Sequence, residues 1–248
     1  MTLSGVYAIW LREMLIFFRE KPRIISAVIN PLFWLLTFGV GLGATVNIAG
    51  VNYEQYIFPG ILMQTFLFSS IFYGAYLVWD RRIDLLKAVL VTPLNRTSIF
   101  LGKVLGGVTF SLIEAVIILA FGFAININYT LTSIPLILIT VIIAAASLTA
   151  IGLIIGSLMT SPEGFQLITT FVIFPLFFLS GALFPLNNLP DYLTTLTIAN
   201  PLTYIVDSLR SLLVGMQYFG TLENILVMVS FAAVANFIGI LAFRRMRA

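Results

Sequence analysis

The sequence predicts an all-α integral membrane protein with six transmembrane helices, an N-terminal interfacial helix, and a short outer helical hairpin between spans five and six, either re-entrant or on the surface. Hydrophobic residues make up 60% of the 248 residues, whereas soluble chains have about 45–50%. Charged residues make up only 9%, too few to cover a water-facing surface. Apolar runs fill nearly the whole chain, so we expect one transmembrane domain over residues 1–248 and no separate soluble domain.

Residues 1–22 form the predicted interfacial helix. Arg12 and Glu13 interrupt the first apolar run, which argues against a cleaved signal peptide. On a helical wheel the large apolar side chains share one arc, and Arg12, Glu13 and Arg19 lie opposite. This division predicts a helix lying in the membrane surface. An ordinary core helix is the alternative, because Ile9 interrupts the polar face.

Six apolar segments have the roughly 20 residues that a helix needs to cross the hydrocarbon core. They are Ile24–Val46, Tyr56–Trp79, Ile99–Ile125, Ile134–Leu158, Phe165–Phe184 and Leu222–Phe243. An even number of spans places both termini on the same side. Twelve of the 13 basic residues fall in the N-terminal segment, the stretch after the second span or the C-terminal tail. The positive-inside rule therefore predicts cytoplasmic termini.

The long segment after the second span carries alternating charged and apolar residues. Asp80–Val91 has the helical spacing of a surface helix offered to a cytosolic partner. A solvated positive-inside loop explains the same composition. Both interpretations stay open on the sequence alone.

The outer end of the fifth span contains residues that interrupt helices. Pro175 lies within the predicted span, and Ser180 and Gly181 follow within two turns. A kink or break is expected there, because proline removes a backbone donor that a neighbouring group must replace. A tolerated bend and an outer gate are equally compatible with this pattern. Pro185 and Pro190 then bound a predicted turn.

A short outer helix is predicted next. Asn200 has the residue type of a helix cap, and Pro201 occupies the first helical position. The apolar periodicity continues over residues 202–214. Asp207 and Arg210 stand three residues apart on this helix, the spacing of an ion pair.

Glu114 is the one carboxylate deep within a predicted apolar span. A charged group exposed to lipid costs at least about 2.5 kcal/mol, so such residues face protein or water. A role in a translocation path and a structural hydrogen bond across a helix interface are equally compatible with its position.

Several classes of chemistry are not expected. Histidine and cysteine are absent, which removes thiolate nucleophiles, histidine bases and the usual zinc and haem ligands. Gly102-Lys103 lacks the upstream glycine of a phosphate-binding loop, so this chain is not expected to hydrolyse ATP. No catalytic residue and no metal site is predicted. The basic residues are scattered, which argues against nucleic acid as a partner.

Three stretches resemble the type-2 permease family of ABC exporters, which includes daunorubicin-resistance-type, Nod-factor and polysaccharide exporters. The stretches are Leu86–Arg96 continuing to Lys103, Phe178–Pro185 with Leu189-Pro190, and Asn200–Gly215. The last two are the most specific. An amphipathic N-terminal helix followed by six spans also fits, so the resemblance covers essentially the whole chain.

The resemblance implies a permease for an amphipathic substrate such as a drug, a lipid or a lipid-linked glycan. The permease would act in membrane lipid as a pair, formed by two copies of this chain or by this chain and a related one. The pair would bind cytosolic ABC ATP-binding subunits, which hold ATP and Mg²⁺. The fifth span and the outer hairpin would form the outer half of the path. The positions implied to couple to the ATP-binding subunit are Arg19, Lys21, Arg81, Arg82, Asp84 and Thr92. An ion-coupled transporter or channel, or a structural membrane subunit, is the alternative.

Overall fold

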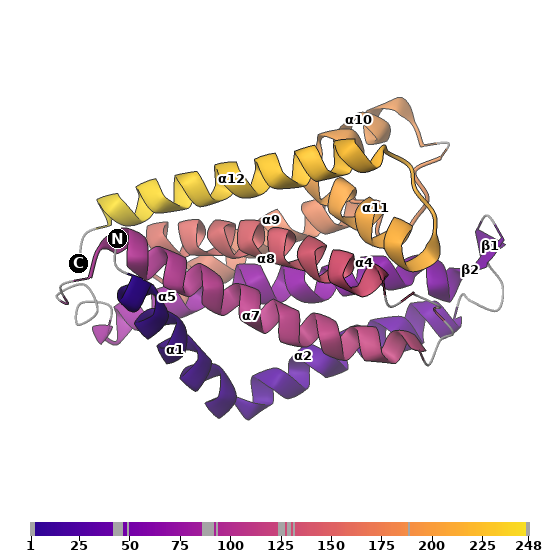
Figure 1. The fold of residues 1–248 in the computed structure, drawn as a ribbon. Coiled ribbons are helices and arrows are strands. Elements are labelled where there is room, and N and C mark those ends of the chain that lie inside the picture. The colour runs from indigo at the N-terminus through magenta and orange to yellow at the C-terminus, as the bar shows by residue number, and fades with distance from the viewer. Residues whose placement is uncertain are drawn as a thin grey trace.

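The computed structural model describes residues 3–41, 47–48, 50–85, 92, 94–123, 127, 130, 132–187 and 189–246. Its helices are α1 (Leu3–Arg19), α2 (Lys21–Trp34), α4 (Tyr53–Phe72), α5 (Ala75–Arg82), α7 (Arg96–Gly122), α8 (Ser133–Leu158), α9 (Pro162–Phe178), α10 (Asp191–Ala199), α11 (Pro201–Val214) and α12 (Thr221–Arg245), with a π-helix η1 (Leu35–Val40). A small antiparallel hairpin pairs β1 (Asn47–Ile48) with β2 (Val51–Asn52). The long helices run along one axis, with both termini at one end and the hairpin at the other (Figure 1).

Among the described residues, four apolar helical stretches are long enough to cross a membrane. They are Tyr53–Arg82, Arg96–Gly122, Ser133–Leu158 and Thr221–Arg245. Two further apolar helices, Val28–Gly39 and Pro162–Phe178, are shorter. The structure therefore supports a multi-pass membrane protein, while helix length by itself supports four of the six predicted spans.

The N-terminal segment is helical over Leu3–Arg19, but part of its predicted polar side is buried. α1 runs across the long helices at the end of the bundle that holds the termini (Figure 1). Ile9, Glu13 and Phe17 are all buried, and Phe17 stacks on Phe110 of α7 with 4.2 Å between ring centroids. The sequence placed Glu13 on the polar face of the helix, with Ile9 as an apolar residue interrupting that face. In the structure both side chains pack against the bundle.

The second predicted span is interrupted in the structure. α4 ends at Phe72, a turn occupies Tyr73 and Gly74, and α5 begins at Ala75. A Cβ added to Gly74 would lie 2.0 Å from the carbonyl oxygen of Gly152, so the turn presses directly on α8. The two backbones approach this closely only because both residues lack a side chain.

Two glycine pairs serve internal packing. A Cβ at Gly102 would lie 2.6 Å from Cβ of Ile9 in α1, and a Cβ at Gly156 would lie 2.4 Å from the carbonyl oxygen of Gly74. Their partners Gly106 and Gly152 are equally crowded. These contacts bind α1 to α7 and the α4–α5 turn to α8.

The fifth helix ends earlier than predicted. α9 ends at Phe178, and turns follow, so the expected helix to Phe184 is wrong. Pro175 consequently lies in the last turn of α9 rather than in mid-span. Gly181 adopts a left-handed φ of 68° within the turns that follow, a conformation that side chains disfavour.

α11 follows the prediction closely. The Asn200 side-chain oxygen accepts from the amide of Leu202 at 3.0 Å, and Pro201 is the first helical residue. The helix ends at Gly215, which has a left-handed φ of 76°. α10 precedes α11, and the two form a helical pair between α9 and α12, in the segment where an outer helical hairpin was expected.

Candidate functional site

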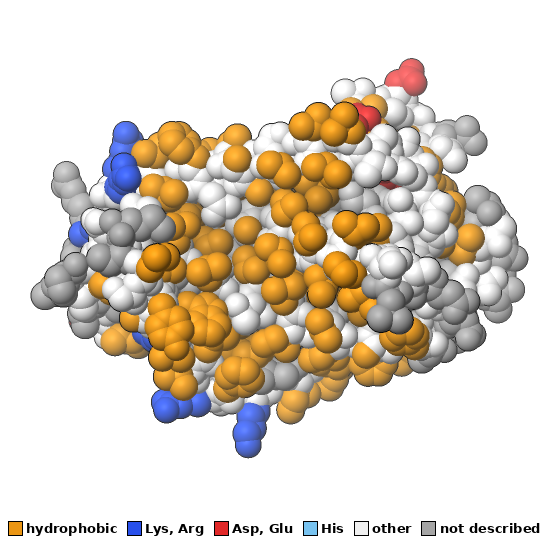
Figure 2. All heavy atoms as spheres, viewed as in Figure 1, with side chains coloured by type: hydrophobic (Ala, Val, Ile, Leu, Met, Phe, Trp, Pro, Cys, Tyr) orange, Lys and Arg blue, Asp and Glu red, His pale blue; other side chains and the backbone are white. Residues whose placement is uncertain are grey.

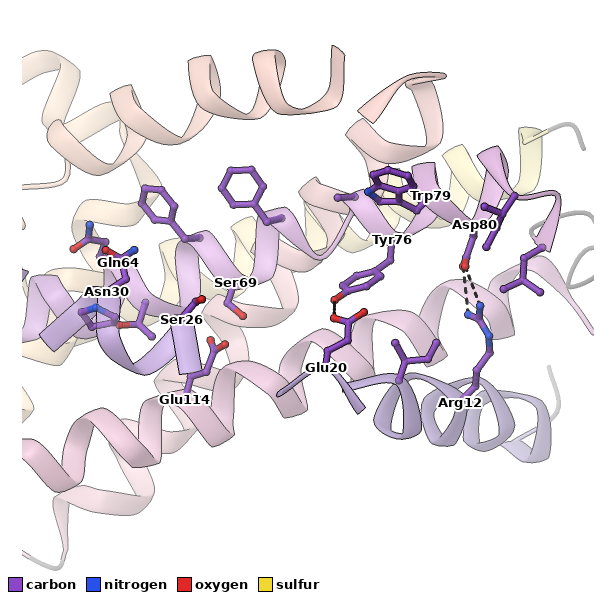
Figure 3. Close-up of a pocket in the computed structure, with 18 residues that line it drawn as sticks. Arg12, Glu20, Ser26, Asn30, Gln64, Ser69, Tyr76, Trp79, Asp80 and Glu114 are labelled. Atoms are coloured by element: carbon purple, nitrogen blue, oxygen red, sulfur yellow. Dashed lines mark hydrogen bonds and ion pairs between the residues drawn. The ribbon is translucent and has the colours of Figure 1, made fainter. Parts of the chain in front are cut away.

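A groove of about 830 Å³ opens between α1, α2, α4, α5 and α7. Most of its wall is apolar or aromatic, and it includes Phe68, Phe72, Tyr76 and Trp79 along α4 and α5. Figure 3 shows Tyr76 and Trp79 between Gln64 toward one end and Arg12 with Asp80 toward the other. The groove has the size and composition of a small-molecule site.

One end of the groove is polar although it lies among apolar helices. Asn30 of α2, Gln64 and Ser69 of α4, and Glu114 of α7 line this end (Figure 3). Gln64 is 4% exposed and Glu114 is 3% exposed. Among the described residues, the side-chain oxygen of Gln64 has no hydrogen-bond partner. A buried acceptor left in this state costs free energy unless a donor reaches it.

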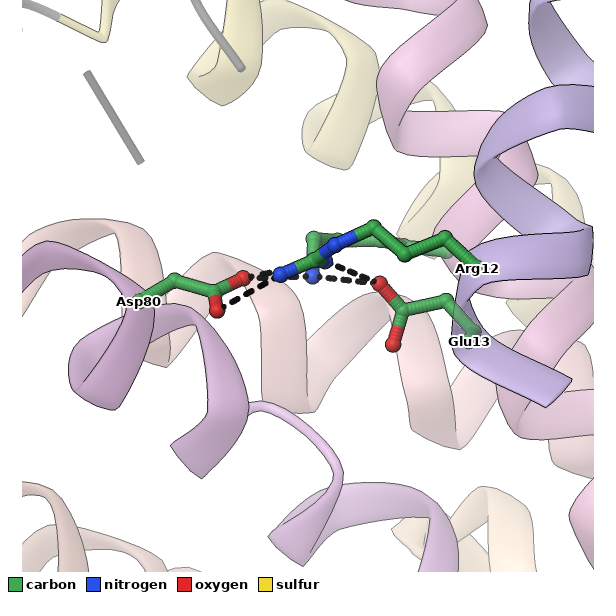
Figure 4. Close-up of polar contacts among 4 residues, drawn as sticks. Arg12, Glu13 and Asp80 are labelled. Atoms are coloured by element: carbon green, nitrogen blue, oxygen red, sulfur yellow. Dashed lines mark hydrogen bonds and ion pairs between the residues drawn. The ribbon is translucent and has the colours of Figure 1, made fainter. Parts of the chain in front are cut away.

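The other end of the groove meets a four-residue ion cluster, which we call the inner ion cluster: Arg12, Glu13, Asp80 and Lys103. Lys103 Nζ lies 2.9 Å from Glu13 Oε1 and 3.2 Å from Asp80 Oδ2. Arg12 spans the same carboxylates, at 2.8 Å from Glu13 Oε1 and 2.9 Å from Asp80 Oδ1 (Figure 4). Two positive and two negative charges therefore balance in a largely buried site, which is the condition under which buried charges are tolerated.

The cluster keeps the Glu13 carboxyl charged. Burial alone would raise its pKa, but the adjacent positive charges of Lys103 and Arg12 outweigh this, and the pKa of Glu13 falls below its ordinary value. The cluster joins three helices, since Glu13 belongs to α1, Asp80 to α5 and Lys103 to α7. It therefore locks α1 onto the helix bundle.

Arg81 and Arg82 tie the end of α5 to the connection between α8 and α9. Arg81 donates hydrogen bonds to the carbonyl oxygens of Ser157, at 2.9 Å, and Met159. These bonds satisfy carbonyls at the C-terminal end of α8. Arg82 lies 3.6 Å from Glu163 in an exposed pair, which contributes little stability.

The other positions implied to couple to a partner are exposed. Arg19 ends α1 and Lys21 begins α2, so they form the corner between these helices. Asp84 adopts a left-handed φ of 57° just after α5, and Thr92 is exposed. The predicted surface helix over Asp80–Val91 is not tested beyond residue 85, because residues 86–91 lie outside the described part of the chain.

At the opposite end, Asp207 and Arg210 do not pair with one another as their spacing suggested. Asp207 accepts from the amides of Tyr218, at 2.8 Å, and Phe219, at 3.1 Å, and from the Asn224 side chain at 2.9 Å. The carboxylate therefore fixes the loop that leads from α11 to α12.

Arg210 has a separate set of partners. Its guanidinium donates to the carbonyl oxygen of Gly181 at 2.7 Å and lies 4.2 Å above the ring centroid of Tyr56. It is 1% exposed. This side chain holds the turn after α9 against α4, so the predicted outer residues Ser180 and Gly181 are brought next to Arg210.

The cap residue of α11 also hydrogen-bonds a backbone carbonyl at the end of α9. The Asn200 side-chain amide donates to the carbonyl oxygen of Leu176 at 2.7 Å, one residue after Pro175. The carbonyls at this helix end thus find a protein donor, as expected in a membrane. Pro185 lies in the turn region and Pro190 directly precedes α10.

The sequence reasoning missed the groove and the cluster partners. Gln64 and Asn30 could have been singled out as amides inside apolar runs, the same signal that identified Glu114. The pairing of Glu13 with Lys103 joins residues 90 positions apart, and a single sequence holds no signal for it.

Comparison with known proteins agrees with this architecture. The family model described as ABC-2 type transporter matches residues 4–214. The ycf38 transport permease of Cyanophora paradoxa is 30% identical over 209 residues, covering 81% of this chain and 71% of that protein. The inner membrane transport permease YadH of Escherichia coli (strain K12) is 26% identical over 218 residues, covering 85% and 83%. Nodulation protein J of Rhizobium leguminosarum bv. trifolii is 24% identical over 248 residues, covering 96% and 92%.

The matched region runs from α1 through the end of α11, and so includes the groove, the inner ion cluster and the turn held by Arg210. More than half of the chain matches the family model, and the relatives are named as transport permeases. The chain belongs to the ABC-2 type transporter family of membrane permeases.

Proposed function

We propose that this permease is the membrane subunit of an ATP-driven exporter and that the groove forms the inner part of its path for an amphipathic substrate. The observation that carries the proposal is the continuity of the groove. It begins beside the inner ion cluster, follows an aromatic wall and ends at the buried Gln64 and Glu114. A molecule with apolar and polar parts finds matching surfaces along this course.

A separate ATP-binding subunit would dock at the end of the bundle that holds both termini, which we place in the cytoplasm. Figure 2 shows Lys and Arg side chains toward that end and a largely hydrophobic middle on the visible face. The α1–α2 corner offers Arg19 and Lys21, both exposed. Because the inner ion cluster locks α1 to α5 and α7, a displacement of this corner would reach the wall of the groove.

A second permease copy would complete the path. α2, α9 and α12 expose large apolar side chains, among them Phe33, Phe171 and Phe237. Lipid and a second copy are the two surroundings that suit such faces. The turn after α9 and the α10–α11 pair would then form the outer part of the path, with Ser180, Gly181 and Pro175 at its edge.

The test is purification of the tagged permease from native membranes, followed by transport in proteoliposomes. We expect an ATP-binding subunit to co-purify, and efflux of an amphipathic dye to require ATP on the side where that subunit binds. The double variant Arg19→Glu with Lys21→Glu should weaken this association at least several-fold, since reversed charges add repulsion. Arg19→Lys with Lys21→Arg, which keeps both positive charges at the same positions, is the matched control.

Two results would contradict the proposal. Transport driven by an ion gradient without ATP would favour an ion-coupled transporter, and a stable complex without any transport would favour a structural subunit. Unaltered association in the Arg19 and Lys21 variant would remove the α1–α2 corner from the interface.

A further inference from the structure

We propose that a second groove, between the ends of α8 and α12, binds an anionic phospholipid from the surrounding membrane. The lipid phosphate would contact Arg81 and Arg245, and one acyl chain would lie along α12. This α8–α12 groove has a volume of about 720 Å³ and, among the described residues, shares no lining side chain with the groove of the proposed function. The inference therefore does not depend on export or on the exported substrate.

The α8–α12 groove follows one face of α12. The α12 residues that line it are spaced i, i+3, i+4 and i+7, which places them in a single stripe: Ile238, Leu241, Ala242 and Arg245. Ile154 and Leu158 of α8 also line the groove. With a rise of about 1.5 Å per residue, Ile238 lies about 10 Å along the helix from Arg245. The groove thus joins a basic end to an apolar course, in the same order as a headgroup and its acyl chain.

The order of basic and apolar residues matches the depth of the groove in a membrane. α12 is one of the helices long and apolar enough to cross a bilayer, and Arg245 is its last residue. Figure 2 shows basic side chains beside hydrophobic ones at the end of α12. Ile238 is 47% exposed and Leu241 is 38% exposed, so a lipid chain can reach both. Arg245 would therefore lie at the level of the headgroups and Ile238 at the level of the chains.

No acidic side chain among the lining residues neutralises the basic end. The sequence has ten Asp and Glu residues, all ten lie in the described part of the chain, and none of them lines the α8–α12 groove. Asp80 precedes Arg81 in the sequence but belongs to the inner ion cluster. Asp84 and Glu163 lie outside the lining, and Glu163 forms an ion pair of its own. Arg81 and Arg245 therefore present positive charge to the groove, and a lipid phosphate is the complementary group.

Arg81 is held in place for such a contact. Its guanidinium donates to the carbonyl oxygens of Ser157, at 2.9 Å, and Met159. Arginine has five N–H donors, so further donors remain for a phosphate oxygen. The Thr160 side chain adds a hydroxyl to the lining. A choline headgroup would bring a quaternary ammonium without N–H groups next to two arginines. The site should therefore prefer phosphatidylglycerol over phosphatidylcholine.

The experiment uses the permease with its native partner in nanodiscs of phosphatidylcholine, at about 0.15 M salt, where the Debye length is about 8 Å. Phosphatidylglycerol or phosphatidylcholine with a photoactivatable acyl chain is added at equal mole fraction. After illumination, the lipid attached to peptides of α8 and α12 is measured by mass spectrometry. We expect phosphatidylglycerol to label these peptides several-fold more than phosphatidylcholine does. Soluble glycerol phosphate, which has the phosphate but no chain, should not reduce this labelling.

Two variants locate the site. Arg245→Gln should lower the labelling by phosphatidylglycerol to the level of phosphatidylcholine and leave the labelling by phosphatidylcholine unchanged, which would show that α12 still packs correctly. Arg244→Gln is the matched control. It removes the same charge one position earlier, at a residue that does not line the groove, and should change the labelling less than twofold.

Four outcomes would overturn the inference. Equal labelling by the two lipids would remove the preference for an anionic headgroup, and equal losses in the two variants would place the lipid elsewhere. Suppression by glycerol phosphate would assign the arginines to a free phosphate. A disulfide-linked dimer of Leu241→Cys after mild oxidation would show that a second copy covers the groove. ATP-driven efflux is measured separately, so none of these outcomes tests the exporter.

Discussion

At the residue scale, the largest single effects should come from the inner ion cluster. Lys103→Met would leave the carboxylates of Glu13 and Asp80 with one cation between them in a buried site. Removing one partner of a buried charge pair typically costs about 3–5 kcal/mol. We expect a loss of this order in the free energy of unfolding, measured by denaturation in detergent.

The matched control for Lys103→Met is Arg82→Met. Arg82 and Glu163 form an ion pair whose side chains are 55% and 76% exposed, and such pairs contribute about 0–1 kcal/mol. Equal losses in the two variants would contradict a special role for the buried cluster. The charge of Lys103 was visible in the sequence, but its burial depends on partners that only the folded chain brings together.

The same cluster predicts how stability depends on pH. The pKa of Glu13 is lowered in the folded protein, so its contribution is complete above the ordinary carboxyl value of 4.5 and is lost as the pH falls through the lowered pKa. The difference in unfolding free energy between the wild type and Glu13→Gln should be constant from about pH 7 to pH 5 and shrink below about pH 4.5. A constant difference down to pH 3 would show that the charge of Glu13 is not what stabilises the site.

At the element scale, the sequence predicted what is encoded locally. α11 begins and ends where Asn200, Pro201 and Gly215 indicate, because a helix cap needs only neighbouring residues. The break at Gly74 was missed, and the end of α9 at Phe178 falls within the region where a kink or break was expected, although the span was predicted to continue to Phe184. Both depend on distant contacts, with Gly152 in one case and with Asn200 and Arg210 in the other.

Alanine variants of Gly181 and Gly215 distinguish the cost of backbone strain from the cost of a steric clash. Both have a left-handed φ, of 68° and 76°. A Cβ at Gly181 would lie 2.5 Å from Cδ2 of Leu186, whereas a Cβ at Gly215 has open space. Gly215→Ala should therefore cost only the backbone strain, about 1–2 kcal/mol, and Gly181→Ala should cost more.

These two variants also test the outer turn as a functional element. If the turn held by Arg210 belongs to the path, Gly181→Ala should reduce ATP-driven efflux per folded complex, while Gly215→Ala should leave it near the wild-type rate. The measurements are thermal stability in detergent and efflux in proteoliposomes normalised to complex. Equal efflux in both variants would leave Gly181 a purely structural role.

At the scale of the whole molecule, the sidedness of the basic residues makes the strongest prediction from the sequence. α5 and the end of α12, which carry Arg81, Arg244 and Arg245, lie at the end that holds the termini (Figure 1), whereas Arg210 lies at the other end beside Gly181. The fold therefore separates the charges in the way that the positive-inside rule requires of cytoplasmic termini. This separation predicts that α10 and α11 face the outside.

Cysteine labelling tests this orientation without background, because the chain contains no cysteine. Ser4 is exposed in α1 and Asn187 is exposed in the turn region before α10. In intact cells an impermeant thiol reagent should label Asn187→Cys and not Ser4→Cys, and permeabilised cells should label both. Labelling of Ser4→Cys from outside, with Asn187→Cys protected, would show that the topology is the reverse of the predicted one. The groove entrance and the proposed docking surface for the ATP-binding subunit would then face the side of the membrane that lacks ATP.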